Sequence, residues 1–234
     1  MVKIEGTIAG PENPSSSFVT VFSVRDQNKV FSTMPGKDGA FVAYIKEGGI
    51  YDLSVDPQKD NFTFFSKIYD LTGEKFSSLE KVSVTLKAAA AGDEITLDGI
   101  SFKSGSEMNP SSSQELRRLT RLMQGNSNRS FSIAVTLLGY QKDSVRSNPD
   151  LTEVIVDTVR IPVIYKIDSV TTATRDSTVI HTTYHNDRTP QQAKALADYL
   201  VNQGIPASRI SHSGKALTEA VEENRKTMVN VIVR

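Results

Sequence analysis

The side chains with the clearest capacity for chemistry are two histidines, His181 and His185, in the segment HTTYH. On a helix, histidines four positions apart can share one metal ion. This segment alternates as a strand does, and a rise of about 3.3 Å per residue would place the two rings about 13 Å apart. We therefore expect exposed strand histidines here and no metal site. His212 is similarly isolated.

The sequence contains none of the short motifs of common catalytic sites. There is no G-x-x-x-x-G-K-S/T loop, G-x-G-x-x-G turn, G-x-S-x-G elbow or H-E-x-x-H helix. Asp and Ser are plentiful, but no motif places a His beside them as in a catalytic triad. Cys is absent, which excludes thiol nucleophiles, thiolate metal sites and disulfides. We expect a protein that is not an enzyme and has no cofactor.

The overall charge is balanced, with 27 Lys and Arg against 27 Asp and Glu in 234 residues. This balance does not favour nucleic acid or an anionic membrane surface as a partner. No apolar run approaches the roughly 20 residues of a membrane span, and MVKIEGTIAG lacks the apolar core of a signal peptide. Because Met1 runs directly into a strand pattern, we expect the sequence to be part of a longer precursor. The length allows two domains of ordinary size.

The elements that position these side chains begin with short runs of alternating residues between positions 1 and 87. The runs are VKIEGTIA, FVTVFSV, GAFVAYIK, IYDLSVD, NFTFFSKI and KVSVTLK. Val2, Ile4, Gly6 and Ile8 share one face of the first run, and Gly residues separate later runs as turns. Six or seven strands in this length predict a small β-sandwich.

Two passages of this region carry a family resemblance. IEGTI (residues 4–8) and PGKDGAFVAYIKEGGIYDLSVD (residues 35–56) resemble the "G-T-V … D-G-x-F … G-x-Y-x-L-x-V" pattern of carboxypeptidase-regulatory-like or transthyretin-like domains. The resemblance covers most of residues 1–87. It implies a non-catalytic spacer or binding module.

The pattern changes after AAAAG (residues 88–92), which we take as a linker. We expect a strand over 95–102, a helix within SSSQELRRLTRLM capped by its serines, and a strand over 130–140 buried on both faces. A second helix should begin after the cap Thr189, with Pro190 in its first turn, Gln192 completing a capping box, and Gly204 ending it. A short helix around 218–224 and a strand over 227–233 complete a second domain of α+β or α/β class, residues 93–234.

A segment at about 143–188 interrupts this second domain as an insertion. EVIVDTVRIPVIYKI and DSTVIHTTYH alternate well enough to pair as a β-hairpin arm. The segment contains four Asp-Ser/Thr-Val/Thr tripeptides, which begin at Asp143, Asp157, Asp168 and Asp176. They resemble an O-glycosylation signature of some Gram-negative envelope proteins. Turn preferences of Asp-Ser and Asp-Thr would also generate them, and we favour that explanation.

The second domain resembles the OmpA-like C-terminal domain, the periplasmic module that binds peptidoglycan. The resemblance rests on Phe102, Gly105, Ser106, Met108 and Pro110, on VTLLGY, and on QQAKALADYLVNQGIPASRI. It implies a β-α-β-α-β mixed sheet that carries the inserted arm. It also implies a location in the periplasm, associated with the outer membrane of a Gram-negative envelope.

The residues that hold diaminopimelate in that family have changed here. The family's Asp falls on Lys142, with Asp143 one residue later, and its helix-start Arg falls on Gln192. Arg188 or Arg225 could supply a guanidinium from a neighbouring loop, and Thr189 lies beside the first of them. These six positions form the predicted ligand site.

Two functions follow from these features. In the first, the chain is a non-catalytic envelope protein whose second domain has lost or altered its peptidoglycan site and serves as a structural or interaction module. In the second, it is a peptidoglycan-binding anchor of an outer-membrane-associated protein. Other envelope proteins are the expected partners of the first, and an exposed strand pair suits such recognition.

Overall fold

The computed structural model describes residues 1–10, 14–73, 78–103, 105–138, 153–185, 187–217 and 226–234, and within these ranges the chain is mostly β. The strands are β1 Val2–Ala9, β2 Phe18–Ser23, β3 Asn28–Thr33, β4 Ala40–Ile45, β5 Ile50–Asp56, β6 Phe65–Asp70, β7 Leu79–Thr85, β8 Glu94–Thr96, β9 Phe131–Leu138, β10 Glu153–Lys166, β11 Thr172–His185, β12 Ile210–Leu217 and β13 Lys226–Val233. The helices are α1 Ser113–Gly125, α2 Thr189–Asn202 and the 3-10 turns η1 Pro14–Ser16, η2 Pro110–Ser112 and η3 Ala207–Arg209.

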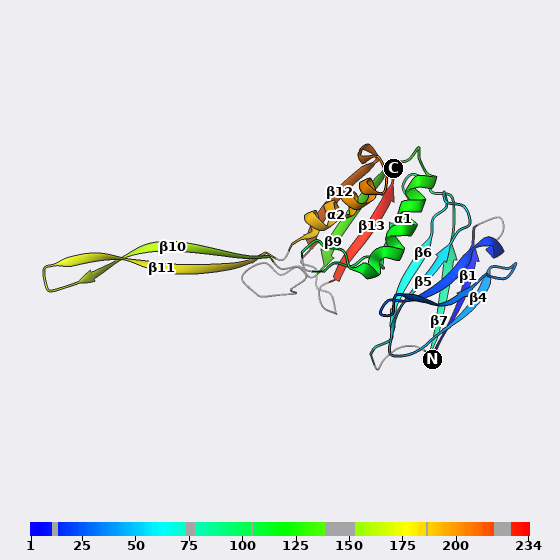
Figure 1. The fold of residues 1–234 in the computed structure, drawn as a ribbon, viewed down its shortest axis with the longest axis horizontal. Helices are drawn as coiled ribbons and strands as arrows, with labels where there is room; N and C mark the ends of the chain where they lie inside the picture. The colour runs from blue at the N-terminus through cyan, green and yellow to red at the C-terminus, as the bar shows by residue number, and fades with distance from the viewer. Residues whose placement is uncertain (11–13, 74–77, 104, 139–152, 186, 218–225) are drawn as a thin grey trace.

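The first seven strands form two sheets around one core. One sheet has the order β4-β1-β7 and the other β3-β2-β5-β6 (Figure 1). The side chains of both sheets meet in a single apolar cluster that includes Ile4, Ile45, Val21 and Leu53. A sandwich of this kind is what the alternating runs predict, because each strand buries one face. Strand β1 pairs antiparallel with β4 and parallel with β7.

The individual strand predictions for this part are confirmed with one omission. Val2, Ile4, Gly6 and Ile8 are all buried, as their spacing predicts. Strand β3 was missed because most of its side chains are exposed and give no alternation of buried apolar residues. In β2 the buried face is the one with Val19 and Val21, while Phe18 is exposed.

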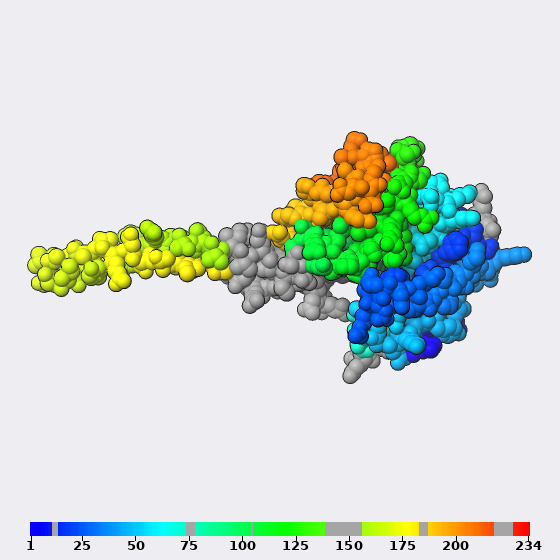
Figure 2. Space-filling model, in the orientation of Figure 1, coloured from blue at the N-terminus to red at the C-terminus, as the bar shows by residue number. Residues whose placement is uncertain are grey.

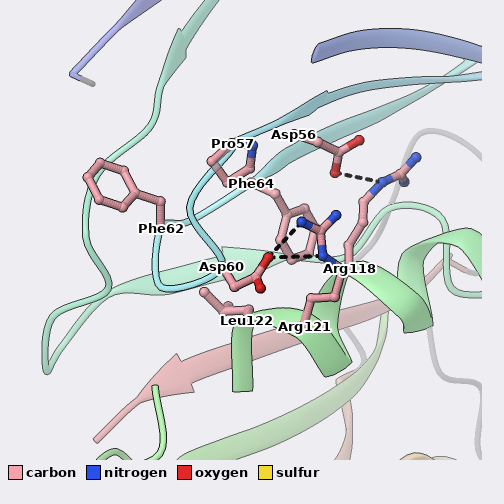
Figure 3. Close-up of a pocket in the computed structure, with 8 residues that line it drawn as sticks. All are labelled: Asp56, Pro57, Asp60, Phe62, Phe64, Arg118, Arg121 and Leu122. Atoms are coloured by element: carbon pink, nitrogen blue, oxygen red, sulfur yellow. Dashed lines mark hydrogen bonds and ion pairs between the residues drawn. The ribbon is translucent and has the colours of Figure 1, made fainter. Parts of the chain in front are cut away.

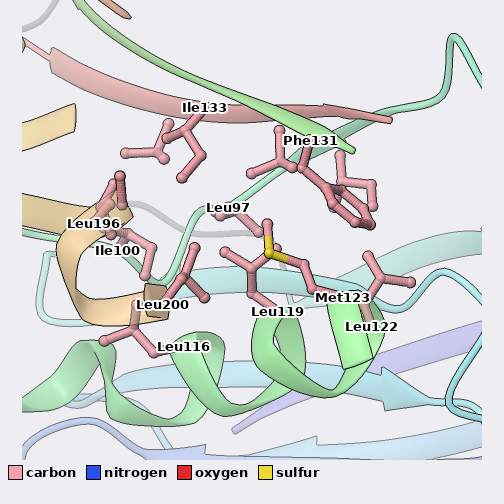
Figure 4. Packing of buried hydrophobic residues seen from close by; sticks show 14 of the residues in the cluster. Leu97, Ile100, Leu116, Leu119, Leu122, Met123, Phe131, Ile133, Leu196 and Leu200 are labelled. Carbon is pink, nitrogen blue, oxygen red and sulfur yellow. The ribbon is translucent and has the colours of Figure 1, made fainter. Parts of the chain in front are cut away.

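The second part is a four-stranded sheet of order β12-β9-β13-β8 with α1 and α2 packed against it (Figure 1). Strand β12 runs parallel to β9, and β13 runs antiparallel to both β9 and β8. Figure 4 shows the apolar side chains of both helices filling the space between the helices and the sheet. Leu119, Leu122, Phe131 and Leu196 are among the most fully buried.

The two helices bury the faces that their spacing predicts, but they are capped differently. Leu116, Leu119, Leu122 and Met123 of α1 are buried. The Ser112 side chain does not cap α1, because it instead accepts a hydrogen bond from the Ser101 amide (2.9 Å). Gly204, at φ 91°, follows α2 as predicted. Val201, whose spacing groups it with the buried Ala193, Leu196, Ala197 and Leu200, is 38% exposed, so the prediction that it is buried is wrong.

The strands around these helices differ from prediction in extent. Strand β8 covers only residues 94–96, and Phe102 forms an isolated bridge with Met108. Strand β9 alternates between buried and half-buried positions, so it is not buried on both faces as its unbroken apolar centre indicated. The predicted helix around 218–224 lies outside the described residues. The predicted domain limits of 1–87, 88–92 and 93–234 stay predictions.

Strands β10 and β11 pair with each other as an antiparallel ribbon, which confirms the predicted hairpin. The register runs from Glu153 opposite His185 to Lys166 opposite Thr172. The ribbon extends far from both sheets (Figures 1 and 2). We call residues 153–185 the arm and the rest of the described chain the body.

Candidate functional site

A buried ionic cluster joins the sandwich to helix α1. The Arg118 guanidinium of α1 donates to Asp52 of β5 at 2.8 Å, and its Nε lies 3.3 Å from an Asp56 oxygen. The same guanidinium donates to Glu115, one turn earlier, at 3.1 Å. The second Glu115 oxygen accepts a 2.7 Å hydrogen bond from the Ser66 hydroxyl of β6. Because every charged member except Asp56 is buried, the cluster holds two parts of the chain together away from water.

One cation serves three carboxylates in this cluster, and burial decides how they ionise. Burial raises the pKa of Glu115 to about 7, although Arg118 acts in the opposite direction. Burial also raises the pKa of Asp56, again against Arg118. Burial opposes the charge on Arg118, but the carboxylates of Asp52, Asp56 and Glu115 together raise its pKa. A proton held by Glu115 near neutral pH relieves part of the excess negative charge.

A more exposed ion pair lies one turn further along the same helix (Figure 3). Arg121 donates to one oxygen of Asp60 from Nε at 3.1 Å and from Nη2 at 2.6 Å. The Arg118–Asp56 and Arg121–Asp60 pairs flank a cavity of about 10 Å³. Phe62, Phe64 and Leu122 are among the other residues that line it. That volume is about the space of one water molecule, so this cavity is not a site for an organic ligand.

The end of α1 touches the backbone of the sandwich at Gly125. A β-carbon built there would lie 2.5 Å from the carbonyl carbon of Asp60 and 2.8 Å from the Asn61 nitrogen. Asn126 adds a side-chain hydrogen bond to the Asn61 carbonyl at 3.3 Å. The glycine therefore sets how closely the helix approaches the sandwich.

We expect Gly125→Ala to destabilise the protein by about 1–3 kcal/mol, because the methyl group overlaps backbone that cannot rotate away. In a free helix the same change would be stabilising. Gly73→Ala is the control, since a β-carbon there meets nothing within 4 Å. Urea unfolding of both variants checks the prediction. Equal stability of the two variants would contradict the close approach at Gly125.

A larger cleft lies between the edge strands β6 and β8. Its volume is about 430 Å³, and its lining includes Lys67, Lys87, Asp93, Glu94 and Asp98. Lys87 and Asp93 pair across it at 2.5 Å. The mixture of charges gives the cleft no preference for one ligand class.

The sequence-predicted ligand site is described only in part. Lys142, Asp143 and Arg225 lie outside the described residues. Thr189 and Gln192 at the start of α2 are fully buried. Their assignment to a ligand site stays a prediction.

The buried polar groups at the start of α2 bind other parts of the chain. The Gln192 amide donates to the Gly105 carbonyl at 3.1 Å and does not complete a capping box. Thr189 is the first helical residue rather than the cap, and its amide and hydroxyl both donate to Asp187, at 3.0 and 2.6 Å. Arg188 stands at the cap position without a side-chain cap hydrogen bond. A β-carbon at Gly214 would lie 2.2 Å from the Thr189 carbonyl carbon, so β12 packs closely against this helix start.

The arm exposes an unusual number of apolar side chains. From 156 to 182 every described side chain is exposed except Ala173 and Val179, which are half-buried. The large apolar side chains among them are Val156, Val159, Ile161, Val163, Ile164, Tyr165, Ile167, Val170 and Ile180. A two-stranded ribbon alone in water is marginally stable, and exposed apolar patches mark contact sites. The arm is therefore the strongest candidate functional surface.

The Asp-Ser/Thr tripeptides of the arm have two structural settings. Asp168 accepts hydrogen bonds from the Val170 and Thr171 amides at 2.8 and 2.7 Å in the turn at the arm's tip, as the turn explanation predicts. Asp157 and Asp176 lie within strands β10 and β11, so the turn explanation is wrong for them. Asp143 lies outside the described residues, and glycosylation stays a prediction.

The two histidines of HTTYH lie in strand β11, as the alternation predicts. His181 is exposed and faces Asp157 across the ribbon. No group of three or more His, Asp or Glu side chains gathers in a metal-binding arrangement within the described ranges. No helix in the part of the chain that the structure describes is long and apolar enough to cross a membrane.

Sequence reasoning missed Glu115 and Arg118. The sequence offers only their three-residue spacing, which is typical of a solvated helix face. The apolar stripe of α1 gave no sign that the opposite face is also covered.

Comparison with known proteins finds no matching family model and no matching curated protein. Among solved structures, a DUF3823 family protein from Parabacteroides merdae ATCC 43184 is similar, with 11% sequence identity and a TM-score of 0.26. The match covers 78% of this chain and 80% of that chain.

These findings correct the assignment of the chain to the OmpA-like and carboxypeptidase-regulatory-like families. Neither family's model matches, and the described chain is mostly β with two α-helices. The matched positions, such as Gly6, Ala193, Leu200 and Gly204, are turn and packing residues that many strand and helix units require. Peptidoglycan and envelope proteins as partners thereby lose their support. The periplasmic location stays a prediction.

Proposed function

We propose that this chain is a non-catalytic interaction protein that binds another protein through its arm. The observation that carries the proposal is the set of nine large apolar side chains on the arm, each at least 38% exposed. Burying such side chains at an interface would be favourable by roughly 25 cal/mol for each Å² of apolar surface removed from water.

The two parts of the body are packed on each other. Their two apolar cores are joined by the ionic cluster around Arg118 and by the close approach at Gly125. The body also exposes eight large apolar side chains, but they are spread over the described residues from 1 to 201 outside the arm, whereas nine lie within residues 156–180 of the arm. This distribution favours binding through the arm over binding through the body.

We expect a photo-crosslinking side chain at Ile164 or Val170, which are 71% and 89% exposed, to form a discrete protein adduct in cells that express the full chain. The same side chain at Tyr44, which is 54% exposed on the body, is the control and should form none. Mass spectrometry identifies the adduct.

The binding is then measured with the identified partner in purified form. Replacing residues 157–181, which begin and end at the Asp157–His181 pair, by a short Gly-Ser turn should weaken it at least about tenfold, in line with loss of an interface centre. Absence of adducts from both arm positions, or unchanged affinity after the arm is shortened, would refute the proposal.

A further inference from the structure

The hydrogen bond that closes the tip of the arm fixes which backbone groups of each strand point outward. The Ile167 amide donates to the Thr171 carbonyl at 2.9 Å, so these two residues form a hydrogen-bonded pair. The register continues from there with Lys166 opposite Thr172, and hydrogen-bonded pairs alternate with non-bonded pairs toward the base of the arm. Odd-numbered residues of the arm therefore bond to the opposite strand, whereas even-numbered residues point their N–H and C=O groups away from it.

The outward edge of β10 lacks two of the N–H groups that a further strand would need. Pro162 has no N–H, and its even number places its nitrogen at this edge. The Thr158 amide belongs to the same edge, and it donates to the Asp157 carboxylate at 2.8 Å. Because both interruptions lie in the central part of the strand, β10 is protected against the addition of a further strand.

The outward edge of β11 has no such interruption. Its even-numbered residues from 172 to 182 each carry an N–H group, because β11 contains no proline. Among the described residues, none of these amides donates to a side chain as the Thr158 amide does. The described sheet that holds β11 has only two strands. This edge therefore presents a row of unpaired backbone donors and acceptors, and the structure that complements such a row is an extended strand.

The exposed apolar side chains of β10 and β11 are divided between the two faces of the ribbon, because strand side chains alternate. The odd-numbered face carries those that are 38–48% exposed, which are Val159, Ile161, Val163 and Tyr165. The even-numbered face carries those that are 61–71% exposed, which are Val156, Ile164 and Ile180. A flat partner would cover one face and leave the other in water. A strand added to an edge places its own side chains on both faces, so it extends both apolar surfaces.

We propose that the arm binds an extended segment of its partner protein as a third strand, along the outward edge of β11. This inference rests on the proposed function of the arm and states which part of the partner the arm recognises. Backbone hydrogen bonds hold the segment, and cross-strand side-chain pairs select it.

The side chains of β11 define the segment that fits. Arg175 and Asp176 are neighbours toward the tip of the arm and lie on opposite faces of the ribbon. Adjacent acidic and basic residues in the segment would pair with them across the new edge. Val179 and Ile180 have the same relation further toward the base, and they favour two adjacent β-branched residues in the segment. The expected partner is therefore an extended segment that carries both pairs and has no proline among the residues that bond to β11.

Two matched proline variants of the full chain test which edge binds. The probe is the protein that forms the adduct with a photo-crosslinking side chain at Val170, in purified form. Thr178→Pro removes an outward N–H from the middle of the β11 edge and should raise the dissociation constant at least about tenfold. Thr158→Pro makes the same change at an outward position of β10 and should leave the dissociation constant within about threefold.

Neither substitution removes a hydrogen bond between β10 and β11, since both positions are even-numbered. The inward amides of Val159 and Val179 should therefore exchange with solvent as slowly in both free variants as in the parent chain. Equal losses of affinity in the two variants, with these amides still protected, would overturn the inference.

Hydrogen exchange of the unsubstituted chain tests the same inference without a variant. When the purified partner is bound, the outward amides of Thr174, Thr178 and Ile180 should exchange at least about tenfold more slowly. The outward amides of Arg160 and Ile164 on β10 should change by less than about threefold. Equal slowing at both edges, or no slowing at the β11 edge, would overturn the addition of a third strand.

The two levels of the proposal fail in different ways. A partner that binds the arm but leaves the outward amides of β11 unprotected overturns the third strand and leaves the arm as the binding element. Absence of adducts from both Ile164 and Val170 overturns both.

Discussion

Replacing Arg118 by methionine is expected to lower the free energy of unfolding by about 3–5 kcal/mol. Methionine keeps much of the side-chain volume but removes the guanidinium that Asp52, Asp56 and Glu115 share. Asp52 already has one buried oxygen without a hydrogen-bond partner. Without the guanidinium, the buried carboxylates of the cluster are paired neither with water nor with another described cation within the cluster.

Arg121→Met is the control for this prediction. Arg121 lies on the same helix and also pairs with the sandwich, but its side chain is 53% exposed and that of Asp60 57%. Solvated pairs of this kind contribute little, so the loss should be below about 1 kcal/mol. Urea unfolding at constant pH and ionic strength measures both variants. Similar losses of unfolding free energy in the two variants would mean that the Arg118 cluster does not hold the sandwich against α1.

The second large effect concerns pH. The free energy of unfolding should fall as the pH rises from about 5 to 8. The pKa of Glu115 is about 7 in the folded chain against an ordinary value of 4.5. Between these values the folded state keeps a proton that the unfolded state has lost, so each rise in pH favours unfolding. The full difference between the two pKa values corresponds to a loss of at most about 3 kcal/mol of stability, and this loss is complete above pH 7. The raised pKa of Asp56 acts in the same direction.

Glu115→Gln should flatten this dependence. The amide keeps the shape but does not titrate, and its single oxygen can accept from only one of the two donors, the Ser66 hydroxyl and the Arg118 guanidinium. The variant should therefore be less stable than the parent near pH 5, and this deficit should shrink as the pH rises to 8. Denaturant midpoints measured at half-unit steps of pH give the comparison. An unchanged slope in the variant would show that another group sets the pH dependence.

The arm and the cluster carry different parts of the proposed function. The cluster fixes how the sandwich sits on α1, while the arm carries the surface that we propose binds a partner. Arg118→Met and the replacement of residues 157–181 should therefore have separate effects: the first changes stability and the second changes binding.

The sequence alone determined much of the local structure. Period-two alternation identified most of the strands and the hairpin of β10 and β11, because a strand that buries one face must alternate. The spacing of Leu116, Leu119, Leu122 and Met123 identified the buried face of α1. Gly204 marked the end of α2, since few other residues adopt its positive φ. Family assignment failed because it relied on residues of this kind, which report local geometry and not ancestry or ligand.

Tertiary structure alone decided the rest. The polar face of α1 reads as solvated, and only its contact with β5 and β6 buries Glu115 and Arg118 and raises the pKa of the glutamate. The Gln192 side chain donates from Nε2 to the Gly105 carbonyl, 87 residues away, while its Oε1, the atom that would accept in a capping box, accepts no hydrogen bond from the described residues. Alternation predicted the two strands of the arm, but only the cross-strand register shows that Asp157 lies opposite His181. Such contacts join residues far apart in the chain, and a local pattern carries no information about which distant surface will cover it.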